Sequence, residues 1–367
     1  MTKPAASRID LLTSWRGIFS ICIVIFHCRI AAMTEITKFS VVFFFIVSGF
    51  LMAMKYHKAD LSGRDYGKFL GWRALRLYTH HWVALAVYVA LVVVFAHGRG
   101  ANWDALLPNA LFVHIFSVKR EVIFSFNGHM WFLGDLLLCY ALYPVLSALL
   151  RRLKFGIQLL MMLSLMAVAG WVMGNNMSPE LLLPAYVFSP VRIYEFAWGI
   201  VLYACYARLR HQVAAWSDAR VSALLLLVMC SSLLLMVMVR YAEGSAVDAF
   251  NEFVLWEIPV MALILTSAFT AGRCSPLIRL LTCRPLMWLA EISLEIYVLQ
   301  AIAGLVYNYM ICPVLGHFGY PLYEYYPVGI FFPLIPMAYL WRRYISIPLN
   351  THARQKFEKK KEKGFAY

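Results

Sequence analysis

The sequence predicts an all-α, polytopic integral membrane protein with about ten transmembrane helices, and three observations support this. Of the 367 residues, 62% are hydrophobic and only 14% are charged, whereas a soluble domain is about 45–50% apolar. The mean hydropathy is +0.70. Ten apolar stretches approach the roughly 17–25 residues that cross a hydrocarbon core. They lie near 15–33, 39–54, 80–97, 130–149, 156–174, 191–207, 221–239, 254–271, 287–311 and 326–342.

The distribution of Lys and Arg predicts that both termini face the cytoplasm. Positive residues accumulate in cytoplasmic loops, and with the amino terminus inside, the richest segment is the inner one at 55–79. Topology and anionic headgroups then explain the formal net charge of +14, so we expect membrane lipid and no nucleic acid as a partner. The outer segments hold only Lys38, Arg99, Lys119, Arg120 and Arg240.

One membrane domain is the simplest organisation, because no internal repeat or linker divides the chain. We expect a cytoplasmic amino terminus at 1–14, a transmembrane domain at 15–348 and a basic cytoplasmic tail at 349–367. The outer segment 98–129 contains an apolar stretch too short to span, which either lies flat or re-enters. The eight cysteines are scattered singly, without the Cys/His clusters that zinc requires, so no metal is expected.

The first predicted helix carries Arg16 and His27. Ionisable residues inside spans are costly and are candidates for function. A step of eleven residues returns to nearly the same helix face about 16 Å further along, which is of the order of the pantetheine arm of coenzyme A. A guanidinium can bind phosphate bidentately, and an imidazole can accept a proton from an attacking hydroxyl. The alternative is an ordinary positive flank and a hydrogen-bonded core histidine.

The segment Ser14–His27 resembles the opening helix of the membrane-bound acyltransferase 3 family, with its Arg-x10-His signature. The resemblance covers about residues 8–348. Three positions depart from it: Asp135 stands where many members have Glu, Gln300 where a His is frequent, and Ile347 where an acidic residue is common. Further segments resemble family motifs in the same order, namely Phe43–Leu51, Arg73–Tyr78, Asn127–Leu133 with Tyr140 and Pro144, Ser189–Gly199, and Leu286–Tyr297.

The resemblance implies an O-acyltransferase of the bacterial inner membrane. Such a protein takes acyl-CoA, usually acetyl-CoA, from the cytoplasm and delivers the acyl group to a hydroxyl. Its acceptor is commonly a cell-surface or exported glycan, free or lipid-linked. The sequence leaves open whether a homo-oligomer forms. The alternatives are a transporter or flippase, which predicts repeats and broken helices that are not visible here, and a non-catalytic scaffold of the same fold.

The resemblance also implies roles for individual residues. His27 is the expected catalytic base, and Asp135 is a candidate catalytic carboxylate. Arg73 and Arg76, three residues apart on one helix face, either bind the CoA phosphates or anchor the helix to anionic lipid. The residues expected to bind the cofactor are Arg16, Ser48, Arg73 and Arg76.

Expected acceptor-binding residues come from later motifs. Arg192 and Glu195 either bind the substrate or form an ion pair within the membrane. A carboxylate could alternatively orient His27, and the sequence does not choose which acid meets which base. Ser48 and Gly49 permit close approach of a slim ligand or of a neighbouring backbone. Aromatic residues such as Trp131 and the cluster 320–326 either stack on sugar rings or form an interfacial belt. The residues expected to bind the acceptor are Asn127, Trp131, Arg192 and Glu195.

Overall fold

The computed structural model describes residues 9–28, 34–57, 59, 61, 63–176, 186–242, 254–318, 326–349 and 351. Within these ranges the secondary structure is helical and contains no strand, which confirms the predicted all-α class. Six helices in the described part are long and apolar enough to cross a membrane, and Phe155–Trp171 and Glu257–Ala268 are shorter apolar helices. The chain is therefore a polytopic membrane protein, while the count of ten spans remains a prediction.

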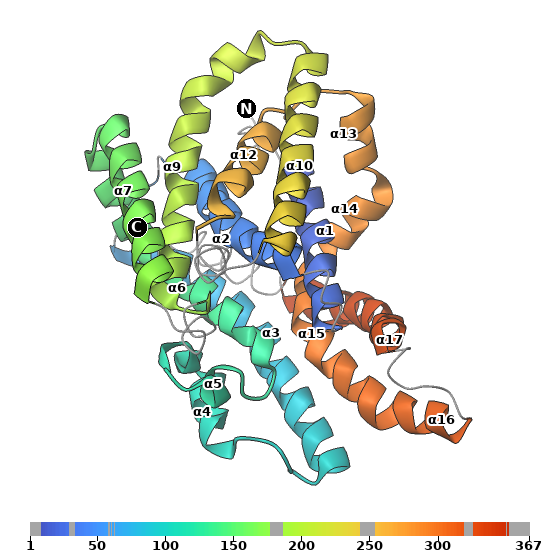
Figure 1. The fold of residues 1–367 in the computed structure, drawn as a ribbon. Helices are drawn as coiled ribbons and strands as arrows, with labels where there is room; N and C mark the ends of the chain where they lie inside the picture. Colours follow the sequence, from blue (N-terminus) through green and yellow to red (C-terminus); the bar gives the residue numbers. More distant parts are fainter. Residues whose placement is uncertain are drawn as a thin grey trace, which may run out of the picture. The chain divides into compact units, whose positions relative to one another are not determined.

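Each predicted span coincides with helical structure (Figure 1). Several boundaries differ from expectation, and the largest extension is that α3 begins at Gly63 where the predicted span begins at 80. The first helix begins at Asp10 and ends at His27, and residues 29–33 lie outside the described part. The ninth predicted span, 287–311, is interrupted at Ile292. The helices are α1 (Asp10–His27), α2 (Thr34–Tyr56), α3 (Gly63–Ala96), η2 (Trp103–Ala105), α4 (Leu106–Ala110), η3 (Val113–Phe116), α5 (Arg120–Ile123), η4 (Gly128–Met130), α6 (Trp131–Arg152), α7 (Phe155–Asn176), α9 (Ser189–Ala214), α10 (Asp218–Tyr241), α12 (Glu257–Ala268), α13 (Pro276–Leu281), α14 (Arg284–Glu291), α15 (Ser293–Val306), η5 (Tyr307–Ile311), α16 (Cys312–His317), α17 (Tyr326–Trp341) and η6 (Arg342–Ser346).

The chain divides into two compact units. The first comprises Met1–Asp60 and Leu138–Glu291, and the second comprises Leu61–Leu137 and Ile292–Tyr367. The long helix α6 runs from the second unit into the first. Each unit is described below by itself.

The first unit is built around the crossing of α2 and α9. A Cβ atom on Gly49 would lie 2.0 Å from the Phe196 carbonyl oxygen, and one on Gly199 would lie 2.1 Å from the Ile46 carbonyl oxygen. The two backbones therefore touch, which only residues without a side chain permit. Of the two interpretations of Ser48 and Gly49, the structure supports the approach of a neighbouring backbone at Gly49.

Helix α1 packs in the same unit through small and aromatic residues. The Trp15 indole Nε1 donates to Ser267 Oγ of α12 at 3.0 Å. A Cβ on Gly17 would lie 2.6 Å from the backbone nitrogen of Ala290 in α14, so α1 and α14 are also in close contact. The ring of Phe19 lies 4.7 Å from that of Phe43 in α2. These contacts fix the position of α1, which carries Arg16 and His27.

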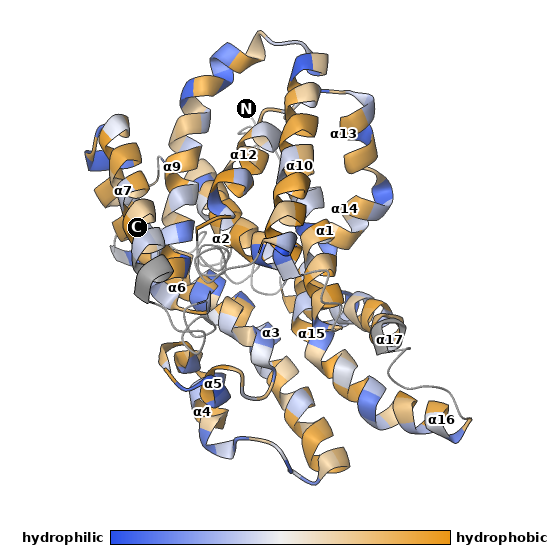
Figure 2. Ribbon diagram, viewed as in Figure 1, coloured by the Kyte–Doolittle hydropathy of each residue, from blue (hydrophilic) through white to orange (hydrophobic). Residues whose placement is uncertain are grey.

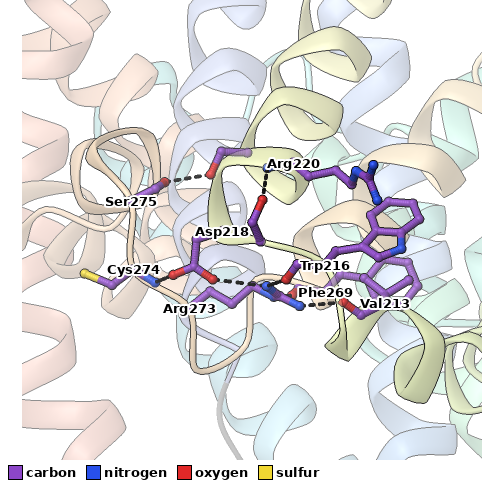
Figure 3. Close-up of polar contacts among 10 residues, drawn as sticks. Val213, Trp216, Asp218, Arg220, Phe269, Arg273, Cys274 and Ser275 are labelled. Atoms are coloured by element: carbon purple, nitrogen blue, oxygen red, sulfur yellow. Dashed lines mark hydrogen bonds and ion pairs between the residues drawn. The ribbon is translucent and has the colours of Figure 1, made fainter.

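The ends of three helices in the first unit are joined by Arg273 (Figure 3). Its guanidinium donates to the Val213 carbonyl at 2.6 Å, the Trp216 carbonyl at 2.6 Å and the Phe269 carbonyl at 3.0 Å. It also binds Asp218 Oδ1 at 3.0 Å. These carbonyls lie where α9 and α12 end, so a single cation satisfies acceptors that helix termini leave open. The aspartate ties the same cation to the start of α10.

Helix α10 shows how the chain meets lipid. It is drawn largely in orange (Figure 2), and its only buried residues are Val221, Leu225 and Ser232. Leu227 is 64% exposed and Leu234 is 60% exposed. Such a surface would be unstable in water, which agrees with its prediction as a membrane span.

In the second unit the segment after α3 folds back along that helix. The Tyr78 hydroxyl donates to the Leu111 carbonyl at 2.9 Å, and the Trp82 indole donates to the Ala110 carbonyl at 2.8 Å. Tyr78 precedes Ala96, the last residue of α3, by 18 positions, which is about 27 Å of helix. The segment 98–129 therefore folds back along α3, and whether it lies flat on the membrane or re-enters it remains a prediction.

Candidate functional site

Arg16 and His27 share the inner face of α1. Both side chains are half-buried, and Ser20, Ile23 and Val24, which lie on the same face by helical spacing, are buried. The imidazole belongs to the last residue of the helix, where the carbonyl end favours positive charge. The structure thus keeps both predicted groups on a packed face of α1, and it places the histidine at the helix terminus rather than midway along the span.

The paired arginines of the second unit lie on α3. The Arg73 guanidinium carbon lies 5.3 Å from the centre of the Phe69 ring, a cation–π contact. Arg76 is exposed. Lys68, which stands nearby in the sequence, forms an exposed ion pair with Asp65 at 3.4 Å. The binding of phosphate by these two guanidinium groups remains a prediction.

Arg192 and Glu195 form an ion pair inside α9. The Arg192 Nη1 atom lies 2.7 Å from Oε1 and 2.8 Å from Oε2 of Glu195, and both side chains are fully buried. The rings of Phe45 and Tyr186 lie 5.6 and 5.0 Å from the guanidinium carbon. Of the acids that the sequence left open, Glu195 is therefore the partner of Arg192. Whether this pair also binds substrate remains a prediction.

The predicted acceptor motif is tied to α15 in the second unit. The fully buried Asn127 donates from Nδ2 to the Val298 carbonyl at 2.9 Å. The Tyr297 hydroxyl donates to the His129 carbonyl. Trp131 is only 7% exposed, so it belongs to a packed interior rather than to an exposed belt. The tyrosines at 320–325 lie outside the described residues.

The predicted residues fall into two sets by unit. Asp135, 1% exposed, stands in the second unit and His27 in the first, so their catalytic pairing remains a prediction. The first set contains Arg16, His27, Ser48, Arg192 and Glu195, and the second contains Arg73, Arg76, Asn127, Trp131 and Asp135.

Comparison with known families decides the identity of the chain. Residues 9–342 match the acyltransferase 3 family model, described as an acyltransferase domain. The chain belongs to the acyltransferase 3 family. This match confirms the resemblance seen in the sequence and makes the protein a multi-pass membrane acyltransferase. The chain matches no curated protein and no solved structure significantly. Among the described residues of this acyltransferase, no group of three or more His, Cys, Asp and Glu side chains is placed to hold a metal ion.

One group of buried polar residues in the acyltransferase was not predicted from the sequence. Glu257 of α12 is 1% exposed, and its Oε2 lies 3.2 Å from the Tyr194 hydroxyl. The Trp198 indole donates to the same hydroxyl at 2.6 Å. Glu257 was visible as an acid within the predicted span 254–271, but only the fold shows that it faces the helix that carries Arg192 and Glu195.

A second missed group joins α3 to the segment 98–129. His81 of α3 bonds through Nε2 to the Asn109 carbonyl at 2.8 Å, and the Asn109 amide donates to the Ser125 carbonyl at 3.0 Å. All three side chains and His114 are at most 6% exposed. Burial and the neighbouring His81 lower the pKa of His114 to about 4, with the Pro108 carbonyl acting in the opposite direction. His114 is therefore neutral at physiological pH and acts as a packed polar group.

Proposed function

We propose that this acyltransferase moves an acyl group, usually acetyl, from acyl-CoA to a hydroxyl of a cell-surface or exported glycan at the bacterial inner membrane. One observation carries the proposal. The region that matches the acyltransferase family, residues 9–342, begins with a helix that keeps Arg16 and His27 on one inner face. A cation and a proton acceptor at that spacing suit a phosphate-bearing thioester and the hydroxyl that attacks it.

Each residue contributes to this reaction by its own chemistry. We assign the CoA phosphates to Arg16, Arg73 and Arg76, because guanidinium groups bind phosphate bidentately. Ser48, half-buried on α2, is assigned to the cofactor as well. His27 is the general base for the acceptor hydroxyl, and its place at the carbonyl end of α1 favours the charge that a base acquires. Asp135 is the candidate carboxylate for that step.

We assign binding of the sugar acceptor to polar and aromatic side chains. Asn127 and Trp131 offer an amide and an aromatic plane, and Arg192 with Glu195 offers a charged pair. In the net reaction the acceptor oxygen–carbon bond forms, the carbon–sulfur bond of the thioester breaks, and the CoA sulfur gains a proton as the acceptor hydroxyl loses one. The thioester is already activated toward oxygen nucleophiles, so the assigned residues need only orient the reactants and move one proton.

Replacing His27 by Ala tests the proposal. Surface glycans of cells that carry the wild-type or the variant chain are compared by mass spectrometry for acyl mass. We expect the acyl mass to fall by about 100-fold or more, the usual contribution of a general base, while the protein remains in the membrane fraction. His211→Ala, which changes an exposed histidine of α9, is the matched control and should retain acylation. A transporter or scaffold would keep its effect on the glycan in His27→Ala, and that result would contradict the proposal.

A further inference from the structure

A serine and a histidine in the second unit are arranged as a nucleophile and its base. His80 of α3 lies with Nε2 at 2.9 Å from Ser346 Oγ and with Nδ1 at 2.7 Å from the Arg76 carbonyl oxygen. The two side chains are 1% and 3% exposed. They are 266 positions apart in the sequence, so no local pattern pointed to the contact.

The hydrogen-bond partners fix the direction of proton transfer. A carbonyl oxygen only accepts, so Nδ1 carries the hydrogen that it donates to Arg76. In the neutral ring Nε2 is then the acceptor, and the Ser346 hydroxyl donates to it. A hydroxyl hydrogen-bonded to an imidazole whose other nitrogen is held by an acceptor is the arrangement of an activated serine nucleophile.

Charged groups near the ring suit the same role. Glu295 of α15, 3% exposed, and Arg76 are close enough to act electrostatically on His80. The Oε2 atom of Glu295 has no hydrogen-bond partner within the described part of the chain. When His80 accepts a proton, the charge of this carboxylate favours the imidazolium, while Nδ1 keeps its hydrogen bond to the Arg76 carbonyl.

The location of the serine is also unusual. Ser346 closes η6, a π-helical turn over Arg342–Ser346, and such turns are rare and frequent at functional sites. On α3, His80 follows Arg73 and Arg76 by seven and four positions, so helical spacing puts all three on one face within about 10 Å along the axis. The same face thus presents two cations suited to phosphate and the base that contacts the serine.

We propose that Ser346 is the first acceptor of the acyl group and that His80 is its general base. The inference rests on the proposed function, because it needs an acyl thioester as the donor. In the first half, the Ser346 Oγ–carbon bond forms, the carbon–sulfur bond breaks, and the serine proton passes through His80 Nε2 to the CoA sulfur. In the second half, the acceptor oxygen–carbon bond forms, the Oγ–carbon bond breaks, and the proton of the acceptor hydroxyl ends on Oγ.

The test is to trap the acyl-enzyme. Full-length protein in lipid nanodiscs is incubated with radiolabelled acetyl-CoA without acceptor, quenched in acid, and analysed for bound label and for the acetylated peptide. The wild type should carry label on Ser346. The amount of bound label on Ser346→Ala should be at least about 100-fold lower, and His80→Gln should acquire label about 100-fold more slowly. Ser346→Cys should form a thioester that neutral hydroxylamine cleaves, whereas the serine ester resists it.

Ser232→Ala is the matched control. It removes a buried helical hydroxyl that donates to the Val228 carbonyl at 2.7 Å, and its labelling should equal that of the wild type. The inference is overturned if Ser346→Ala is labelled like the wild type, if label maps elsewhere, or if Ser346→Ala still acylates the glycan at the wild-type rate. A wild-type protein that transfers no acyl group to glycan and takes none from acetyl-CoA would instead refute the proposed function.

Discussion

Glu195→Gln should destabilise the protein by leaving Arg192 as an unpaired cation in the interior. The wild-type guanidinium meets both carboxylate oxygens at 2.7 and 2.8 Å, and neither side chain is exposed. Removing one partner of such a pair costs about 3–5 kcal/mol. The rings of Phe45 and Tyr186 still lie against the guanidinium in the variant, so we expect the lower end, about 3 kcal/mol.

The melting temperature in detergent, followed by tryptophan fluorescence, measures this loss. By extrapolation to a chain of this size, about 3 kcal/mol corresponds to roughly 3–6 °C. The double variant Arg192→Met with Glu195→Met removes both charges and should regain most of the loss, because an apolar replacement of a buried pair is often neutral. Glu121→Gln, on an exposed acid of α5, is the control and should not change the melting temperature.

Two results would refute the reasoning. Glu195→Gln could melt within about 1 °C of the wild type, or the double variant could melt as low as the single one. The double variant also separates structure from function. If it is stable but no longer acylates glycan, the pair binds substrate as the sequence suggested, and if it acylates normally, the pair serves the fold alone.

Three further predictions concern the helix contacts and the segment 98–129. Gly199→Ala should lower the free energy of unfolding by about 3 kcal/mol or more, because its Cβ would lie 2.1 Å from a carbonyl oxygen of α2. The control is Gly71→Ala, where nothing lies within 4 Å, and it should not lower the melting temperature. Equal losses in the two variants would contradict the close crossing of α2 and α9. Arg273→Lys keeps the charge but not the planar guanidinium, so we expect the free energy of unfolding to fall by about 2–3 kcal/mol. Proteolysis between α9 and α10 should become faster. Unchanged proteolysis would argue against the role of Arg273 in joining the helix ends. Because the folded pKa of His114 is lowered to about 4, protonation favours the unfolded chain, and stability should fall as pH drops from about 6.5 toward 4, by about 2 kcal/mol at pH 5. His114→Gln should flatten this dependence in melts at pH 7.5 and 5, and an unaltered slope would assign it to other groups.

Local properties of the chain made part of the site predictable. The Arg16 and His27 face follows from helical spacing, and the three-residue spacing of Arg192 and Glu195 on one helix made their ion pair one of the expected alternatives. The short interruption at Ile292 was not predicted, because no Gly or Pro stands near it in the sequence. The packing of 98–129 along α3 was not predicted either, since an apolar stretch too short to span carries no information about the surface that it meets.

The sequence by itself determined that this chain is a helical membrane protein of the acyltransferase 3 family, because apolar length, charge asymmetry and ordered motifs are written along the chain. The tertiary structure decided which polar groups meet across it. Glu257 reaches Tyr194 over 63 positions and His80 reaches Ser346 over 266. Buried polar atoms must find partners wherever the fold brings them, and membrane helices of similar hydropathy give no sign in the sequence of which neighbour supplies that partner.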